Sequence, residues 1–131
     1  LHLLLAEDNE LNAEIAVTLL EEQGAKITAV TNGKEALEAI QNAAPRTYDA
    51  ILMDVMMPEM NGLEATRCIR AFEGKGPDEG TPIIAMTANV FADDVKACLD
   101  AGMNSHVGKP LDMKILMAEI LKYTNRTRSI C

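Results

Sequence analysis

Three acidic residues follow short apolar runs at places where they could act together in chemistry. Glu7 and Asp8 come directly after the apolar residues 3–6, and Asp54 lies near the end of the apolar residues 50–55. If both runs are neighbouring parallel strands, the acids meet at the carboxyl edge of the sheet, where open α/β folds bind ligands. Three like charges in one cleft repel each other, which a divalent cation would offset. Oxygen ligands without histidine or cysteine favour Mg²⁺ over zinc.

A hydroxyl and an ammonium group stand at the ends of two later apolar runs. Thr87 closes the run that starts at Pro82, and Lys109 follows the short run 105–108. At the rim of an acidic metal site these groups suit a phosphoryl group, because lysine offsets charge on phosphate oxygens and a hydroxyl donates to one of them. Asp54 would then be the nucleophile, since a carboxylate can form an aspartyl phosphate. Each residue alone also fits a solvated acid, a strand threonine or a surface lysine, so the prediction depends on their coincidence.

Apolar runs and helical patterns alternate along the chain and predict the elements that must position these residues. Strands are expected at residues 3–6, 25–30, 50–55, 82–88 and 105–108, with a helix after each. Helix caps are expected at Asn9, Asn32, Asn61 and Asp112. Apolar stripes at helical spacing are Leu11, Ile15 and Leu19 in the first helix and Ala65, Ile69 and Phe72 in the third. This alternation indicates a doubly wound α/β fold, with five helices on a five-stranded parallel sheet of order 2-1-3-4-5.

Composition limits the function classes. A chain of 131 residues with 48% apolar and 24% charged residues is typical of one soluble globular domain. The net charge of −8 argues against direct nucleic-acid binding. No apolar run is long enough to span a membrane, so we expect no membrane contact by this domain. Three widely spaced cysteines favour a reducing, cytoplasmic setting. Because the first residue is not Met, we expect a fragment of a larger parent protein, which could itself be membrane-anchored.

Several motifs, in a fixed order along nearly the whole chain, resemble the receiver domain of two-component response regulators. They are Leu4-Leu-Ala-Glu-Asp-Asn9, Met53-Asp-Val-Met-Met-Pro-Glu-Met-Asn-Gly62, Met86-Thr-Ala88, Gly102-Met103 and Gly108-Lys-Pro110. The resemblance implies that Asp54 accepts a phosphoryl group from a phosphohistidine on a partner protein. It further implies that Asp8 and Asp54 bind Mg²⁺, with Glu7 acting largely through water and the Met56 backbone carbonyl completing the protein ligands.

The same resemblance implies a conformational switch. Thr87 and Lys109 would contact the phosphoryl oxygens, the Thr87 hydroxyl would swing toward the phosphate, and a ring three residues before the lysine would turn inward. That ring is His106 here, where Tyr or Phe is commoner, and Glu7 stands where Asp is commoner. Structural roles fall to Pro58 and Gly62, which end the third strand and complete its turn, and to Pro110, which the family places after a cis bond.

Residues 6–12, 86–89 and 102–106 are similar in style to receivers of hybrid sensor histidine kinases. This implies a receiver domain over residues 1–124, followed by a tail or linker over 125–131. Its partner would be a histidine kinase core or a histidine phosphotransfer domain, and a homodimer is left open. The domain itself would be a signalling module with only self-phosphorylation and autodephosphorylation chemistry, although its parent could be a histidine kinase. The alternative context is a stand-alone response regulator.

Three other readings compete with this one. A haloacid-dehalogenase-like phosphatase, which also forms an aspartyl phosphate, would want an acid two residues after the nucleophile, where Met56 stands. A flavin-binding, flavodoxin-like protein would open its first loop with hydroxyl and glycine residues that bind a phosphate, whereas Glu7 and Asp8 would repel a phosphate there without a metal. A degenerate receiver that serves only as a scaffold would not need the complete set of acids, Thr87 and Lys109.

Overall fold

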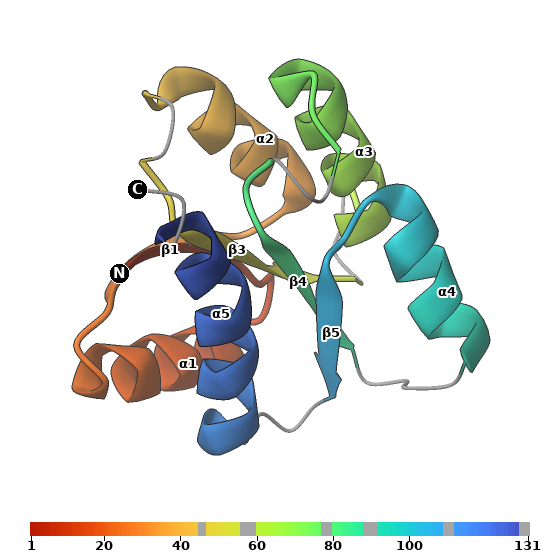
Figure 1. Cartoon of the computed structure of the whole chain (residues 1–131). Helices are drawn as coiled ribbons and strands as arrows, with labels where there is room; N and C mark the ends of the chain where they lie inside the picture. The colour runs from red at the N-terminus through yellow and green to blue at the C-terminus, as the bar shows by residue number, and fades with distance from the viewer. Residues whose placement is uncertain (45–46, 56–59, 77–79, 88–91, 109–111, 129–131) are drawn as a thin grey trace.

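The computed structural model describes residues 1–44, 47–55, 60–76, 80–87, 92–108 and 112–128, and it confirms the predicted architecture (Figure 1). Within these ranges the strands are β1 (His2–Ala6), β2 (Lys26–Val30), β3 (Ala50–Asp54), β4 (Ile83–Thr87) and β5 (Ser105–Gly108). The helices are α1 (Glu10–Glu22), α2 (Gly33–Asn42), α3 (Gly62–Glu73), α4 (Ala92–Ala101) and α5 (Met113–Arg128). All strand pairs are parallel, in the order β2-β1-β3-β4-β5.

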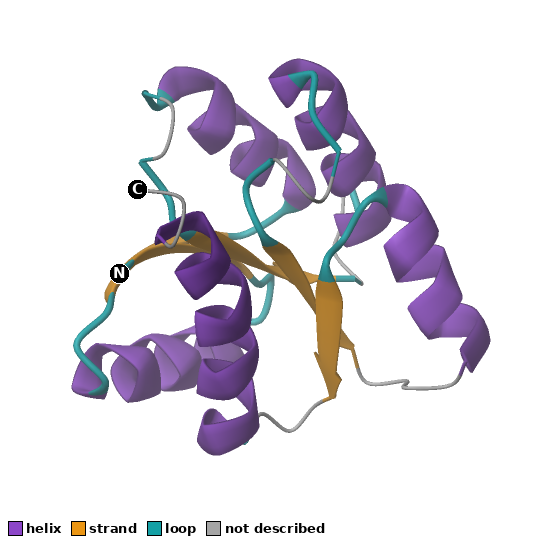
Figure 2. Ribbon diagram, viewed as in Figure 1, coloured by secondary structure: helices purple, strands orange, loops and turns teal. Residues whose placement is uncertain are grey.

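Helices cover both faces of the sheet, which is why its strands are apolar runs rather than alternating ones. Side chains of α1 and α5 pack on one face and those of α2, α3 and α4 on the other (Figure 2). Successive strand residues point to opposite faces, so Leu3 and Leu5 enter the first core while Leu4 and Ala6 enter the second. All four are fully buried.

Of the two predicted apolar stripes, the one in α1 does not form the buried face of its helix, and the one in α3 does so at Ala65 and Ile69 but not at its third residue. In α1, Leu11 is 64% exposed and Ile15 is 50% exposed, whereas Ala16 and Leu20 are buried. The helix carries two apolar faces, and the one with the small Ala16 packs on the sheet, leaving the Leu11, Ile15 and Leu19 stripe at the surface. In α3, Phe72 is 53% exposed.

Asparagine caps set the starts of the helices that follow the functional strand ends. The Oδ1 atoms of Asn9, Asn32 and Asn61 accept hydrogen bonds from backbone N–H groups three residues on, at 2.8–2.9 Å. Asp112 Oδ1 accepts from the backbone N–H of Lys114 at 2.9 Å and from that of Ile115, three residues on, at 3.3 Å. The four predicted caps are therefore confirmed. The last helix continues to Arg128, four residues beyond the expected end of the domain at residue 124. No helix in the described part of the chain is long and apolar enough to cross a membrane.

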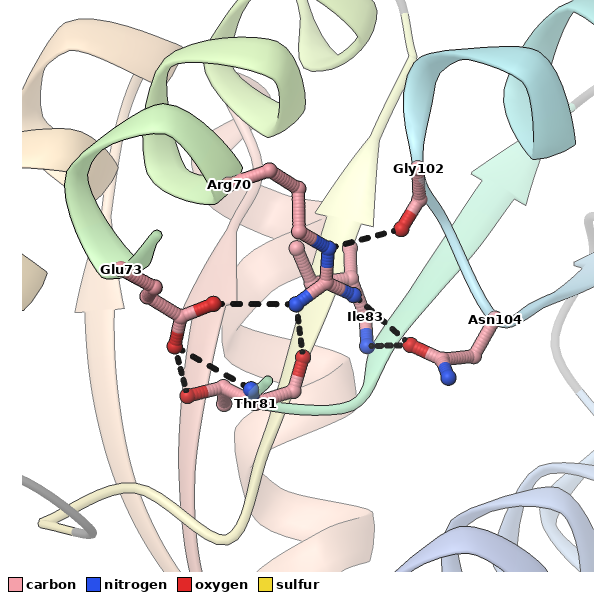
Figure 3. Close-up of polar contacts among 6 residues, drawn as sticks. All are labelled: Arg70, Glu73, Thr81, Ile83, Gly102 and Asn104. Atoms are coloured by element: carbon pink, nitrogen blue, oxygen red, sulfur yellow. Dashed lines mark hydrogen bonds and ion pairs between the residues drawn. The ribbon is translucent and has the colours of Figure 1, made fainter. Parts of the chain in front are cut away.

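A buried arginine holds the amino edge of the sheet together (Figure 3). Arg70 of α3 donates from Nε to the Gly102 carbonyl, from one terminal nitrogen to the Thr81 carbonyl, and from the other to Asn104 Oδ1, each at 2.9 Å. It also forms an ion pair with Glu73 at 3.0 Å.

The partners of Arg70 are themselves fixed. Glu73 accepts from both the backbone and the hydroxyl of Thr81, and Asn104 Oδ1 also accepts from the N–H of Ile83. This Arg70 cluster thus joins α3 to the starts of β4 and β5. Thr66, Ile69 and Arg70 lie on the buried side of α3, whereas Phe72 is exposed.

Candidate functional site

The three acids that follow β1 and end β3 lie together at the carboxyl edge of the sheet. One carboxylate oxygen from each of Glu7, Asp8 and Asp54 lies within 4.8 Å of the other two. The strand register explains this, because Ala6 pairs with Met53 and the next residue of each strand emerges at the same edge. We call these three residues the acidic cluster.

Burial differs within the acidic cluster. Glu7 and Asp54 are each only 4% exposed, while Asp8 is exposed to solvent. Asn12, in the first turn of α1, donates from Nδ2 to Glu7 Oε1 at 3.4 Å. The donor set is made of carboxylate oxygens, without nitrogen or sulfur, and it is open to solvent on the Asp8 side. Such a set fits a hard divalent cation such as Mg²⁺.

Backbone contacts fix the two connections that carry the acids. The N–H of Glu7 donates to the Val30 carbonyl at 3.1 Å, which extends the β1–β2 ladder by one residue. After Asp54, the N–H of Val55 donates to the Met86 carbonyl at 3.2 Å. The N–H of Gly62 then returns to the Val55 carbonyl at 3.0 Å and closes the connection.

Gly62 has no room for a side chain. A β-carbon added there would lie 2.4 Å from the Asp54 carbonyl oxygen and 3.0 Å from the Met53 side chain. The chain can therefore start α3 directly against the backbone of Asp54 only with glycine at this position. Two other residues predicted in this connection, Met56 and Pro58, lie outside the described residues.

Thr87 lies at the same edge of the sheet as the acidic cluster. It is the last residue of β4 and is buried, and β4 is the neighbour of β3 through the pairing of Asp54 with Met86. His106 is half-buried in β5, where it pairs with Ala85, one residue before the buried Val107. Lys109 and Pro110 follow β5 and lie outside the described residues.

Two residues beside the site were missed by reading the sequence. Asn12 contacts Glu7, and a polar residue in the first turn after the Asn9 cap was the only local signal for it. Gly33 contacts the connection after Asp54 through a hydrogen bond from its N–H to the Met60 carbonyl at 2.9 Å. Gly33 lies in the first turn of α2, whereas Met60 lies just before α3, so no short-range sequence pattern indicates the contact.

Known proteins share this arrangement. The model of the response regulator receiver domain family matches residues 3–121. The chain belongs to this family. It is a receiver domain of two-component systems, and its five-stranded sheet with two helical layers is the fold of that family.

Three relatives show the range of similar proteins. Probable histidine kinase 1 of Oryza sativa subsp. indica is 40% identical over 149 residues, a match that covers 92% of this chain and 15% of that protein. The receiver domain of the sensor histidine kinase PA1611 of Pseudomonas aeruginosa PAO1 was crystallised with a magnesium ion coordinated in its active-site cleft. It is 35% identical with a TM-score of 0.82, and the alignment covers 95% of this chain and 97% of that one.

The third relative comes from a complex. A chain of the Saccharomyces cerevisiae co-crystal of the histidine phosphotransfer protein Ypd1 with the receiver domain of Ssk1 is 25% identical to this chain. Its TM-score is 0.86, and the alignment covers 97% of this chain and 90% of that one. Relatives of this receiver domain thus include a much longer histidine kinase and a chain from the complex of a receiver domain with a histidine phosphotransfer protein.

Proposed function

We propose that this receiver domain accepts a phosphoryl group on Asp54 from a phosphohistidine of a partner protein, with Mg²⁺ bound at the acidic cluster. The observation that carries the proposal is the position of Asp54. Its carboxylate is buried at the end of β3, within 4.8 Å of the carboxylate oxygens of Glu7 and Asp8. The magnesium ion in the related PA1611 receiver domain supports the choice of metal.

The transfer itself needs one nucleophile. A carboxylate oxygen of Asp54 attacks the phosphorus atom, the phosphorus–nitrogen bond breaks, and the histidine nitrogen keeps the bonding electron pair. Asp8 and Asp54 would hold the metal directly, Glu7 through water, and the Met56 carbonyl would complete the protein ligands. Bound there, Mg²⁺ supplies positive charge next to the phosphoryl oxygens.

Residues at the same edge would respond to the new phosphate. Thr87 is buried at the end of β4, and its hydroxyl would donate a hydrogen bond to a phosphoryl oxygen. The ammonium group of Lys109 would donate to a phosphoryl oxygen as well. Movement of Thr87 would make room for the ring of His106, two positions along the neighbouring strand. The test is the variant His106→Tyr. If phosphorylation-dependent partner binding is the same in this variant as in the wild type, His106 is not a necessary switch residue.

The phosphoryl donor would be a histidine kinase core or a histidine phosphotransfer domain, as the Ypd1 complex and the kinase relatives indicate. We place the receiver domain at residues 1–124 within a hybrid sensor histidine kinase. The exposed Leu11 and Ile15 line a shallow surface depression on α1 together with Glu14, Thr18 and Leu19. Because α1 starts two residues after Asp8, an apolar helix of the donor packed here would bring its phosphohistidine to the acidic edge.

This docking surface can be separated from the chemistry. Ile15→Asp should slow transfer from a phosphorylated phosphotransfer domain about tenfold, the effect of losing roughly 1.4 kcal/mol at an interface. The rate of phosphorylation by acetyl phosphate should be unchanged, because this small molecule does not need to dock on α1. Phe72→Asp on α3, at an equally exposed apolar position over the other sheet face, is the control. Equal transfer rates in both variants would mean that α1 is not the docking surface.

The proposed function is tested by the intact mass of the protein after incubation with acetyl phosphate and Mg²⁺. We expect the addition of one phosphoryl group, absent in Asp54→Asn and absent with a chelator. Sustained turnover of acetyl phosphate without a modified protein would instead favour a phosphatase. If Asp54→Asn gains the phosphoryl group to the same level, the proposal is wrong.

A further inference from the structure

The turn between β2 and α2, residues 30–33, contacts both connections that carry the acidic cluster. At its start, the Val30 carbonyl accepts from the N–H of Glu7 at 3.1 Å. At its end, the N–H of Gly33 donates to the Met60 carbonyl at 2.9 Å, in the connection that follows Asp54. We call residues 30–33 the bridging turn. The bridging turn thus lies against both connections that carry the acids.

Gly33 is the closest point of this bridge. A β-carbon added at Gly33 would lie 2.3 Å from the Met60 carbonyl oxygen, 2.9 Å from the β-carbon of Ala65 and 3.0 Å from the Asn61 carbonyl oxygen. The backbone of Gly33 is not among the glycines with positive φ, so alanine could adopt its conformation. Glycine is therefore required here for close approach rather than for an unusual backbone conformation.

The bridging turn is itself held in place on the α2 side. Glu35 Oε1 accepts from the backbone N–H of Thr31 at 2.7 Å and from its hydroxyl at 2.6 Å. Asn32 Oδ1 accepts in return from the N–H of Glu35 at 2.8 Å. This reciprocal capping leaves the turn little freedom to move away from Met60.

From Met60 the contacts lead directly to the nucleophile. Two residues later, Gly62 donates to the Val55 carbonyl and lies against the Asp54 carbonyl so closely that no side chain fits between them. The segment 60–62 is thus packed between Gly33 on one side and the backbone of Asp54 on the other. A displacement of Met60 therefore reaches Asp54 through a short, tightly packed stretch of backbone.

We propose that Gly33 is a positioning residue of the phosphorylation site. Through Met60 it sets how closely the Asp54 carboxylate lies to Glu7 and Asp8, and so how well the acidic cluster holds a divalent cation. This inference rests on the proposed function in assigning a metal to the cluster. The bridging turn acts as a fixed spacer between the two acid-bearing connections.

Gly33→Ala provides the direct test, because the Met60 carbonyl must retreat from 2.3 Å to beyond 3.0 Å to admit the new methyl group. We expect the dissociation constant for Mg²⁺, measured by calorimetric titration, to rise about tenfold or more, as for other changes to groups that support metal ligands. The backbone amide resonances of Glu7, Val55 and Gly62 should shift already in metal-free protein.

Two other glycines supply controls. Gly24→Ala forces φ +89 on alanine but adds a methyl group with nothing within 4 Å, so it destabilises the fold away from the site. Gly76→Ala requires no positive φ and also adds a methyl group with nothing within 4 Å, so it should change neither the backbone nor the packing. Both should bind Mg²⁺ as the wild type does. If Gly33→Ala folds poorly, Asn32→Ala removes the cap without adding atoms and should shift the same amides by less.

The outcomes separate the two proposals. Wild-type affinity for Mg²⁺ in folded Gly33→Ala, with unshifted amides, overturns the positioning role and leaves the proposed function intact. Weakened binding in Gly24→Ala to the same extent also overturns it, because general destabilisation would then explain the effect. Absence of Mg²⁺ binding in the wild type overturns the metal site and this inference together.

Discussion

The two edges of the sheet both hold buried charge, but they arrange it in opposite ways. At the amino edge, the Arg70 guanidinium has an anion in Glu73 and carbonyl or amide oxygens from three residues in two separate parts of the chain. At the carboxyl edge, the acidic cluster brings three groups of one sign within 4.8 Å of each other. The first arrangement pairs a cation with an anion of the chain, while the second gathers like charges, whose repulsion a bound cation would offset.

The difference indicates what each edge contributes. A buried cation with matched acceptors fixes the elements that it joins, and removing it leaves several polar groups without their partner. Carboxylates that repel each other lower stability but attract a divalent cation and, with it, a phosphoryl group. The amino edge thus gives the fold a rigid base, and the carboxyl edge holds the acids to which we assign the reaction.

Loss of Arg70 should have the largest effect on stability. Arg70→Met keeps the apolar stem and removes the donors to Gly102, Thr81 and Asn104, so we expect a loss of about 3 kcal/mol in the free energy of unfolding by urea. The control Arg67→Met lies on the exposed side of the same helix and should change it by less than about 0.5 kcal/mol. A loss below about 1 kcal/mol for Arg70→Met would show that the cluster does not fix the amino edge.

Neutralising one acid should have a smaller effect of opposite sign. In metal-free buffer at low salt, Asp8→Asn should raise the free energy of unfolding by at most about 1 kcal/mol, because it removes repulsion between charges about 4–5 Å apart and Asp8 is exposed. Wild-type protein should gain about 1.4 kcal/mol at a Mg²⁺ concentration ten times the dissociation constant, and Asp8→Asn should gain much less. A metal-free variant less stable than the wild type would contradict the repulsion.

A change at Glu35 should have the smallest effect on stability, because this carboxylate is exposed, although it accepts two hydrogen bonds from Thr31. The Thr31 hydroxyl, and after it the Thr31 backbone N–H, lower the pKa of Glu35 from its ordinary value of 4.5. A carboxyl whose pKa is lower in the folded than in the unfolded protein stabilises the fold at pH values above the unfolded-state pKa. This contribution is lost as the pH falls through the folded-state pKa. Glu35→Gln should therefore be slightly less stable than the wild type at pH 7, with the difference shrinking below pH about 4.5.

The matched control for this change is Glu38→Gln, on the exposed side of the same helix. The difference in stability between Glu38→Gln and the wild type should not shrink at acid pH as we expect for Glu35→Gln. A constant difference for Glu35→Gln from pH 7 down to acid pH, measured by urea unfolding, would mean that the Thr31 contacts do not favour its charged form.

The sheet and the positions of the acids could be predicted from the sequence because their signals are local. Each strand is a continuous apolar run, and Asp54 and Thr87 stand where such runs end. Parallel pairing then brings the ends of neighbouring strands to one edge. The helix caps were predictable for the same reason, since a cap at Asn61 needs only the residues directly after it.

The contacts that the sequence did not reveal join residues far apart in the chain. Arg70 meets acceptors 11, 32 and 34 residues away, so its burial cannot be inferred from the pattern of α3 alone. Gly33 and Met60 belong to different strand–helix units. In α1, apolar residues occupy two faces, and helical spacing does not say which face packs on the sheet. Only the packing of Ala16 and Leu20 into the core made Leu11 and Ile15 surface residues.

The central claim is that Asp54, and not another acid of the cluster, is the phosphoryl acceptor. Borohydride reduction of protein treated with acetyl phosphate and Mg²⁺ converts an acyl phosphate into an alcohol, and peptide mass spectrometry then locates the modified residue. We predict homoserine at position 54, with Glu7 and Asp8 unmodified. Modification of Asp8 or Glu7 in place of Asp54 would contradict the account.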